Sequence, residues 1–155
     1  ISMNKNIFSI DPSINEIGWA TINITGIEIA DVIKTQGDTL EAKLQDLAAK
    51  VQRAILNPAI PHPCSVLIEL PAAFTYTRSA NRQTGRGMNA ASLQKLNLAI
   101  GVIFGVVVKL GIKPVFVPVA WKGRSNKRLS MAITGIKNHN ASDALLMLRW
   151  YKARR

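Results

Sequence analysis

A chain of 155 residues, 48% of them hydrophobic, is long enough to bury one sizeable core and too apolar to be mainly disordered. Its net charge of +11 is unevenly spread, because only one acid, Asp143, follows Glu69, among fifteen Lys and Arg residues. Such a surface favours a polyanionic partner, most often nucleic acid, and the single cysteine excludes an internal disulfide and fits a reducing compartment.

The beginning of the chain predicts an antiparallel meander of three strands. Residues 6–11 (NIFSID) are typical of a buried strand, and this one ends in an acid that is followed by turn residues. Residues 17–23 and 27–33 flank Thr25 and Gly26, a pair that favours a hairpin.

A helix and a fourth strand follow this meander. Apolar residues at spacings of three and four predict a helix from Thr39, capped by Asp38 or Thr39 and ended by the Asn-Pro pair at 57–58. Residues 65–70 (SVLIEL) predict a strand parallel to the first, reached through that helix.

The second half predicts a long apolar helix, a last strand and two further helices. The apolar helix starts at Asn89 or Ser92, after a basic loop, and is stopped by Gly111. Its apolar stretch falls short of the roughly 20 residues that span a bilayer, so we expect a helix packed on a sheet and no membrane segment. The remaining predictions are a strand at 114–119, a basic loop at 121–128, a short helix at 129–136 and a helix at 140–151.

These elements predict a single α/β domain over residues 3–155, with a five-stranded mixed sheet and helices on both faces. Residues 1 and 2 precede Met3, and we interpret them as a remnant of an expression vector.

Three acids stand at positions that need an explanation. Alone, Asp11 could bond turn amides, Glu69 could pair with an arginine, and Asp143 could be an ordinary acid in the first turn of the last helix. In a sheet ordered 3-2-1-4-5, however, the first and fourth strands are neighbours, so Asp11 and Glu69 come side by side and the last helix can bring Asp143 alongside. Such close carboxylates repel one another, which predicts bound Mg²⁺ or Mn²⁺. Two such ions about 3.5–4 Å apart can cleave a phosphodiester, which is nuclease chemistry.

A fourth functional group is expected close to Asp143 on the last helix. His139 and Asn140 lie four and three residues before it, so either can share its helix face. His139 could ligate a metal or handle a proton, or simply face solvent. Asn140 is also an attractive N-cap, and its amide oxygen is a weaker Mg²⁺ ligand, so we rank His139 first.

Three segments of the sequence, FSIDPSINEIGWATI, VLIELP and HNASDALLMLRW, resemble RuvC-type Holliday-junction resolvases of the RNase H-like (integrase-like) superfamily, in particular a compact phage-type member. The resemblance implies metal-dependent, paired nicking of four-way DNA junctions by a homodimer in a bacterial or phage-infected cytoplasm. It implies catalytic roles for Asp11, Glu69 and Asp143. Asn140 stands where many members carry a fourth acid, and histidine in some relatives favours His139; natural variation and an inactivating substitution would both give Asn.

Two basic segments are candidates for DNA contact. The first carries three arginines at intervals of four behind two aromatic residues, and arginines neutralise phosphates while aromatic rings stack on unpaired bases. The resemblance implies an aromatic wedge here, for which Phe74 ranks before Tyr76, although either could cover the core. The arginines are Arg78, Arg82 and Arg86, and the second segment holds Lys122, Arg124, Lys127 and Arg128.

Lys122 has a further expected role. It resembles a lysine that relatives place near the scissile phosphate, where a positive charge stabilises the transition state. The leading hypothesis is therefore a Mg²⁺-dependent endonuclease that is selective for branched DNA. The alternatives are a catalytically weak nucleic-acid-binding protein, motivated by the missing fourth carboxylate, and an RNase H-like nuclease that acts on RNA–DNA hybrids or forks.

Overall fold

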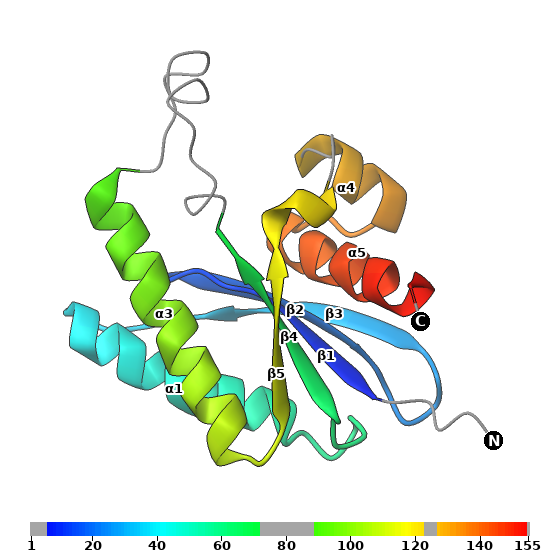
Figure 1. Ribbon diagram of the computed structural model, residues 1–155, viewed down its shortest axis with the longest axis horizontal. Coiled ribbons are helices and arrows are strands. Elements are labelled where there is room, and N and C mark those ends of the chain that lie inside the picture. Colours follow the sequence, from blue (N-terminus) through cyan, green and yellow to red (C-terminus); the bar gives the residue numbers. More distant parts are fainter. Residues whose placement is uncertain (1–5, 72–88, 123–126, 155) are drawn as a thin grey trace.

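The computed structural model describes residues 6–71, 89–122 and 127–154 (Figure 1). In chain order its elements are β1 (Ile7–Asp11), β2 (Glu16–Ile22), β3 (Glu28–Lys34), α1 (Leu40–Ile55), β4 (Ser65–Leu70), α3 (Ala90–Lys109), β5 (Lys113–Pro118), the 3₁₀ helix η2 (Val119–Lys122), α4 (Lys127–Thr134) and α5 (His139–Ala153).

The five strands form one mixed sheet in the order β3-β2-β1-β4-β5, as the sequence predicted. β1, β2 and β3 pair antiparallel through short connections, whereas β4 and β5 return parallel to β1 after helical crossovers. The register pairs Ile10 with Ile68, so the next residue of each strand, Asp11 and Glu69, lies at the same end of the sheet.

Helices cover both faces of the sheet, which confirms the predicted α/β class (Figure 1). α1 and α3 lie on one face over Phe8, Ile10 and Ile68. On the other face α5 packs on a second cluster that contains Ile7 and Leu67. Even-numbered residues of β1 and β4 therefore face α1 and α3, and odd-numbered residues face α5, as the period of two along a strand requires.

The cap of α5 differs from the prediction. Asn138, not Asn140, is the N-cap, and its Oδ1 accepts hydrogen bonds from the backbone N–H groups of Asn140 and Ala141 at 2.9 and 3.1 Å. The helix therefore begins at His139, and Asp143 is its fifth residue, so the prediction of an acid in the first turn was wrong. Stabilisation by the positive end of the helix falls off after that turn, so it does not explain this position.

Other boundaries also moved. α1 begins after the predicted N-cap Thr39 but ends at Ile55, before the Asn-Pro pair, because Leu56 already closes it. The long helix has its predicted cap, Asn89. The segment expected to be a basic loop instead contributes η2 and the first turn of α4, which starts at Lys127.

α3 is longer than its apolar core suggested. With 20 residues and a mean hydropathy of 1.7 in its most apolar window, it is long and apolar enough to cross a membrane by length and composition alone. The core helix of a soluble protein passes the same test, and Ala99, Ile103 and Val107 are fully buried against α1 and the sheet. Only 28% of that window is buried, however, so α3 also presents an apolar outer face.

Candidate active site

The sheet brings two of the three predicted acids to one face and one end. Asp11 is the last residue of β1, and Glu69 is the second-last residue of β4. Each follows directly after one of the paired residues Ile10 and Ile68. Both have odd numbers, so both side chains extend from the face that α5 covers. The geometry that the strand order predicted for this pair is therefore present.

The third acid reaches the same place because α5 is held close to the sheet. The Ser9 hydroxyl of β1 donates a hydrogen bond of 2.8 Å to the carbonyl oxygen of Ala144. Gly18 of β2 lies directly under the first turn of α5, where a Cβ atom would come within 2.0 Å of the Asn140 carbonyl oxygen. These two contacts set the height of α5 and place Asp143, which is only 8% exposed, over the strand ends.

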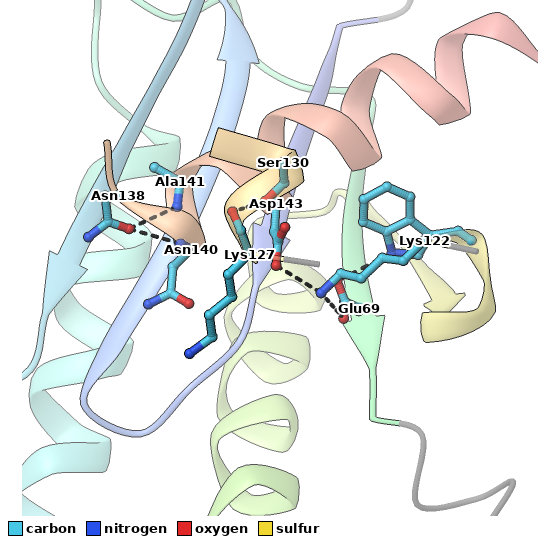
Figure 2. Close-up of polar contacts among 9 residues, drawn as sticks. Glu69, Lys122, Lys127, Ser130, Asn138, Asn140, Ala141 and Asp143 are labelled. Atoms are coloured by element: carbon cyan, nitrogen blue, oxygen red, sulfur yellow. Dashed lines mark hydrogen bonds and ion pairs between the residues drawn. The ribbon is translucent and has the colours of Figure 1, made fainter. Parts of the chain in front are cut away.

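A lysine lies between two of these acids. The Lys122 ammonium Nζ is 3.1 Å from Glu69 Oε1 and 2.9 Å from Asp143 Oδ2, so it bridges β4 and α5 (Figure 2). Trp121 Nε1 donates a further hydrogen bond of 3.3 Å to Glu69 Oε2. η2 supplies both residues, although the sequence predicted a loop from residue 121 onward.

Proton affinities in the cluster show how strongly its members interact. Burial raises the pKa of Asp11 well above its usual range, and the neighbouring Glu69 and Asp143 raise it further, while Lys122 opposes them. Burial also raises the pKa of Glu69, against the opposing effect of the Lys122 ammonium and its hydrogen bond. For Lys122, burial lowers the pKa, but the carboxylates of Glu69, Asp11 and Asp143 outweigh it and raise that pKa above its ordinary value. Three clustered carboxylates thus interact with one ammonium, two of them through direct ion pairs.

The two candidates for the fourth group lie at the start of α5 beside another acid. Asn140 Nδ2 and Asn138 Nδ2 donate hydrogen bonds of 3.1 and 2.6 Å to Glu16 Oε1, and these bonds lower the pKa of Glu16. His139 is half-buried, and its charge also acts on Glu16. Within the described part of the chain, no hydrogen bond or ion pair joins His139 or Asn140 to the three clustered acids, so the choice between them stays a prediction.

The chemistry of the cluster fits a hard divalent cation. Its donors are carboxylate oxygens, which suit Mg²⁺ and Mn²⁺. The Lys122 ammonium shows that a positive charge can be held between Glu69 and Asp143. With Lys122 in that position, no three His, Cys, Asp or Glu side chains of the described residues are arranged to hold one ion together. A metal ion held by all three acids would therefore require their side chains to rearrange.

Most of the predicted DNA-contacting residues lie outside the described residues, namely Phe74, Tyr76, Arg78, Arg82, Arg86 and Arg124. Lys127 and Arg128 are described, and both are exposed at the start of α4. Figure 2 shows the Lys127 side chain extending in the same direction as that of Asn140.

Sequence reasoning missed several residues that support the site. Gly18 interrupts an apolar strand between two large residues, and this was a usable signal of a close backbone approach. Trp121 stood beside the predicted Lys122, but nothing in the sequence indicated its bond to Glu69. Ser9 and Glu16 gave no signal, because their partners are more than 100 residues away.

The fold and the strand-end acids together define an α/β domain with an RNase H-like sheet. Two solved structures share this fold along nearly the whole chain. RuvC from Thermus thermophilus in complex with a Holliday junction substrate is 15% identical, with a TM-score of 0.67 over 97% of this chain and 96% of the other. A second Thermus thermophilus RuvC structure is 18% identical, with a TM-score of 0.63 over 96% of each chain.

At these identities the likeness concerns the fold, and it confirms the RuvC-like, RNase H-like architecture that the sequence motifs predicted. No protein-family model matches the chain, and no curated protein matches it in sequence.

Proposed function

We propose that this protein is a structure-selective endonuclease that nicks four-way or otherwise branched DNA in the presence of a divalent cation. The observation that carries the proposal is the convergence of Asp11, Glu69 and Asp143 around Lys122 at one end of a RuvC-like sheet. One of the structural neighbours, RuvC from Thermus thermophilus, is bound to a Holliday junction substrate. The net charge of +11 supplies the attraction for DNA phosphates.

The three carboxylates would hold the metal, for which we propose two Mg²⁺ ions, with Mn²⁺ as a substitute. Bound ions of this kind activate a water molecule and neutralise the charge that develops on the leaving oxygen. The carboxylates of Asp11 and Glu69 fix the position of that charge on a rigid sheet. His139 or Asn140 would complete the site, and a half-buried imidazole at 139 can accept or return a proton.

Basic and aromatic side chains around the site would hold the substrate. Lys122 would stabilise the negative charge of the phosphate that is cut. Lys127 and Arg128 are exposed at the start of α4, a helix that packs on α5, and they would neutralise flanking phosphates. We also assign phosphate contacts to Arg78, Arg82, Arg86 and Arg124, and base stacking at the branch point to Phe74 and Tyr76.

Paired nicks in opposing strands need two acid clusters, whereas one chain supplies one. We therefore propose a homodimer that acts in a bacterial or phage-infected cytoplasm. The outer face of α3 offers an apolar surface for the second copy, since Leu98, Phe104 and Val108 are 43%, 38% and 50% exposed there.

A nicking assay tests this function. Labelled four-way junction, linear duplex, fork and RNA–DNA hybrid would be incubated with Mg²⁺ or Mn²⁺, and we expect symmetric nicks confined to the junction. Asp11→Asn and Glu69→Gln should each lower the cleavage rate by roughly 10³-fold or more. Their junction affinity should be unchanged or higher, because less negative charge then faces the phosphates. Cleavage by these variants at the wild-type rate would show that the site is elsewhere.

The contact between Asn140 and Glu16 favours one alternative function. Residue 140 is an amide whose Nδ2 is engaged by Glu16, so it adds no fourth carboxylate to Asp11, Glu69 and Asp143, which is what a junction-binding protein with weak catalysis would show. Binding without cutting in either metal, by both the wild type and Asn140→Asp, would establish that alternative. Preferential cutting of the hybrid would instead indicate a nuclease of RNA–DNA hybrids.

A further inference from the structure

The acid cluster is neutralised by a side chain of the protein itself, the Lys122 ammonium. Lys122 Nζ lies within 3.1 Å of Glu69 Oε1 and 2.9 Å of Asp143 Oδ2 at the same time. The side chains of Glu69 and Asp143 are 8% and 12% exposed, so both carboxylates depend on this ammonium for neutralisation. Without it, they would add to the repulsion that already acts on Asp11.

An ammonium and a divalent cation cannot both hold these oxygens. The ammonium lies 3.1 and 2.9 Å from these oxygens, and a bound Mg²⁺ would lie about 2.1 Å from them. Two positive charges so close in a partly buried site repel strongly. Lys122 is the partner that can move, because its charge is carried on a flexible four-carbon stem and its side chain is still 22% exposed. Asp143 and Glu69 are fixed on a helix and a strand.

We propose that Lys122 is a built-in counter-ion that occupies the cation position between Glu69 and Asp143 and leaves it when a divalent ion binds, thereby setting the metal affinity of the site. The proposal rests on the proposed function in taking these acids as metal ligands. It goes further in giving the lysine two positions, one that stabilises the metal-free protein and one in which the released ammonium can meet a DNA phosphate.

Metal affinity without DNA tests the competition directly. Mn²⁺ binding would be measured by titration calorimetry on the wild type and on Lys122→Met, which keeps the length of the side chain and removes its charge. We expect Lys122→Met to bind Mn²⁺ ~10-fold more tightly or better, because no ammonium has to be displaced. Lys122→Arg keeps the cation and should remain within about 3-fold of the wild type.

A matched control separates this competition from total charge. Lys113→Met makes the same change in net charge at an exposed residue that pairs with Ser65, at the opposite end of β4 from Glu69. It should leave Mn²⁺ affinity unchanged. Equal affinities for the wild type and Lys122→Met, or an equal gain in Lys113→Met, would overturn the proposal.

An NMR titration of the wild-type protein tests the same displacement without any substitution that could disturb folding. Ammonium protons held in ion pairs exchange slowly, so the ¹H–¹⁵N signal of Lys122 Nζ should be visible by NMR in the metal-free protein. Titration with diamagnetic Mg²⁺ should shift or abolish this signal in step with the Mg²⁺ occupancy measured by calorimetry. A signal that stays unchanged while Mg²⁺ saturates the site would show that Lys122 does not leave.

The two proposals fail in different ways. If the wild-type protein cuts no junction while Lys122→Met binds Mn²⁺ more tightly than the wild type, the nuclease function is contradicted and the counter-ion proposal stands. If the wild-type protein cuts junctions but Lys122→Met and the wild type bind Mn²⁺ equally well, the nuclease function stands and the counter-ion proposal is contradicted.

Discussion

Asp11 carries the largest electrostatic penalty of the three clustered acids. Glu69 and Asp143 are each in direct ion pairs with Lys122, whereas Asp11 feels that ammonium only at longer range. Burial and the two neighbouring carboxylates therefore raise its pKa well above the usual range. In the absence of metal, the ionised Asp11 side chain destabilises the fold that positions it.

This penalty predicts that Asp11→Asn stabilises the metal-free protein. The amide has nearly the same shape and removes the buried charge, so the free energy of unfolding at pH 7 should rise by roughly 1–3 kcal/mol. Because the folded-state pKa is raised, the folded protein binds more protons than the unfolded chain above about pH 4, and wild-type stability falls as pH rises through that window. The gain should therefore vanish below about pH 4 and grow towards neutral pH.

Urea unfolding in a chelator between acid and neutral pH measures this dependence. Asp46→Asn is the control of opposite sign, because the hydrogen bond from Lys50 and the Gln36 backbone N–H lower the pKa of Asp46. That variant should lose stability, and only above the ordinary carboxyl pKa. A pH-independent gain in Asp11→Asn would mean that its effect is not electrostatic.

Asn140 permits a second prediction at the scale of single residues. In Asn140→Asp a carboxylate replaces the amide that donates to Glu16 Oε1, so two carboxylates face each other and the N–H donor between them is lost. Unfolding of the metal-free variant should become easier by about 1 kcal/mol. With Mn²⁺ present, the added carboxylate should raise metal affinity and junction cleavage, since a carboxylate ligates better than an amide.

The matched control is Asn138→Asp. This variant also loses a hydrogen bond to Glu16, but Asp is as good an N-cap as Asn, and residue 138 precedes the helix that carries Asp143. It should destabilise the metal-free protein without any gain in metal affinity. A similar gain in both variants would place residue 140 outside the metal site.

The residues of the cluster differ in how far sequence could reveal them. Asp11 and Glu69 were predictable because strand order and the two-residue period alone decide which side chains share an edge and a face. Asp143 was found from its motif, although its assignment to the first turn failed. The engagement of Asn140 by Glu16 depends on how β2 lies under α5, and no local pattern encodes that packing.

At the scale of elements, the site depends on the distance between α5 and the sheet. At Gly18 the two elements approach closely, because any Cβ there would overlap the Asn140 carbonyl group at 2.0 Å. The backbone of both elements is involved, so neither side can yield by a change of rotamer. Ser9 fixes the same helix further along, through the Ala144 carbonyl.

Gly18→Ala should therefore lift α5 and separate Asp143 from the strand-end acids. We expect a loss of roughly 3 kcal/mol in the free energy of unfolding and a fall in cleavage larger than the fall in folded protein. Gly101→Ala is the matched control, since a Cβ at that exposed position of α3 meets nothing within 4 Å and should gain up to about 1 kcal/mol.

Both variants would be compared by thermal unfolding, under conditions where the midpoint does not depend on protein concentration. Gly18→Ala with wild-type stability and activity would show that the backbone of α5 can move at no cost, and that its height does not set the site.

Elements with strong local signals were predicted well, and elements defined by packing were not. The hairpin followed from its turn residues, and the parallel return of β4 followed from the helical period of the segment before it. The caps of α1 and α3 followed from the side chains of Thr39 and Asn89. η2 escaped prediction because a short 3₁₀ helix has no period of its own, and Trp121 and Lys122 tie it to Glu69 of β4. At the start of α5 the cap is Asn138 and not the predicted Asn140, because an Asn side chain caps equally well at either position and packing decides between them.

At the scale of the whole molecule, the outer face of α3 is the apolar surface on which the proposed homodimer would form. Leu98, Gly101, Gly105 and Val108 recur at helical spacing on its outer face, and Phe104 stacks there on Phe116 of β5 with ring centroids 5.5 Å apart. Added Cβ atoms at the two glycines would meet nothing, so another backbone can approach closely. A polyanion does not cover such a face, and we therefore propose it as the surface on which a second copy of the chain would bind.

A charge placed on this face tests the homodimer. Val108→Glu would bury a carboxylate against the partner's equivalent surface, and we expect the dimer to dissociate roughly 100-fold more readily by sedimentation equilibrium. Ile24→Glu makes the same kind of change at a residue that is 68% exposed near the β2–β3 turn, and it should leave association unchanged. Because one chain holds a single acid cluster, the Val108→Glu monomer should nick one strand of a junction without the paired second cut. Paired cutting by a protein that sediments as a monomer would exclude this face as the interface and remove the geometric reason for a dimer.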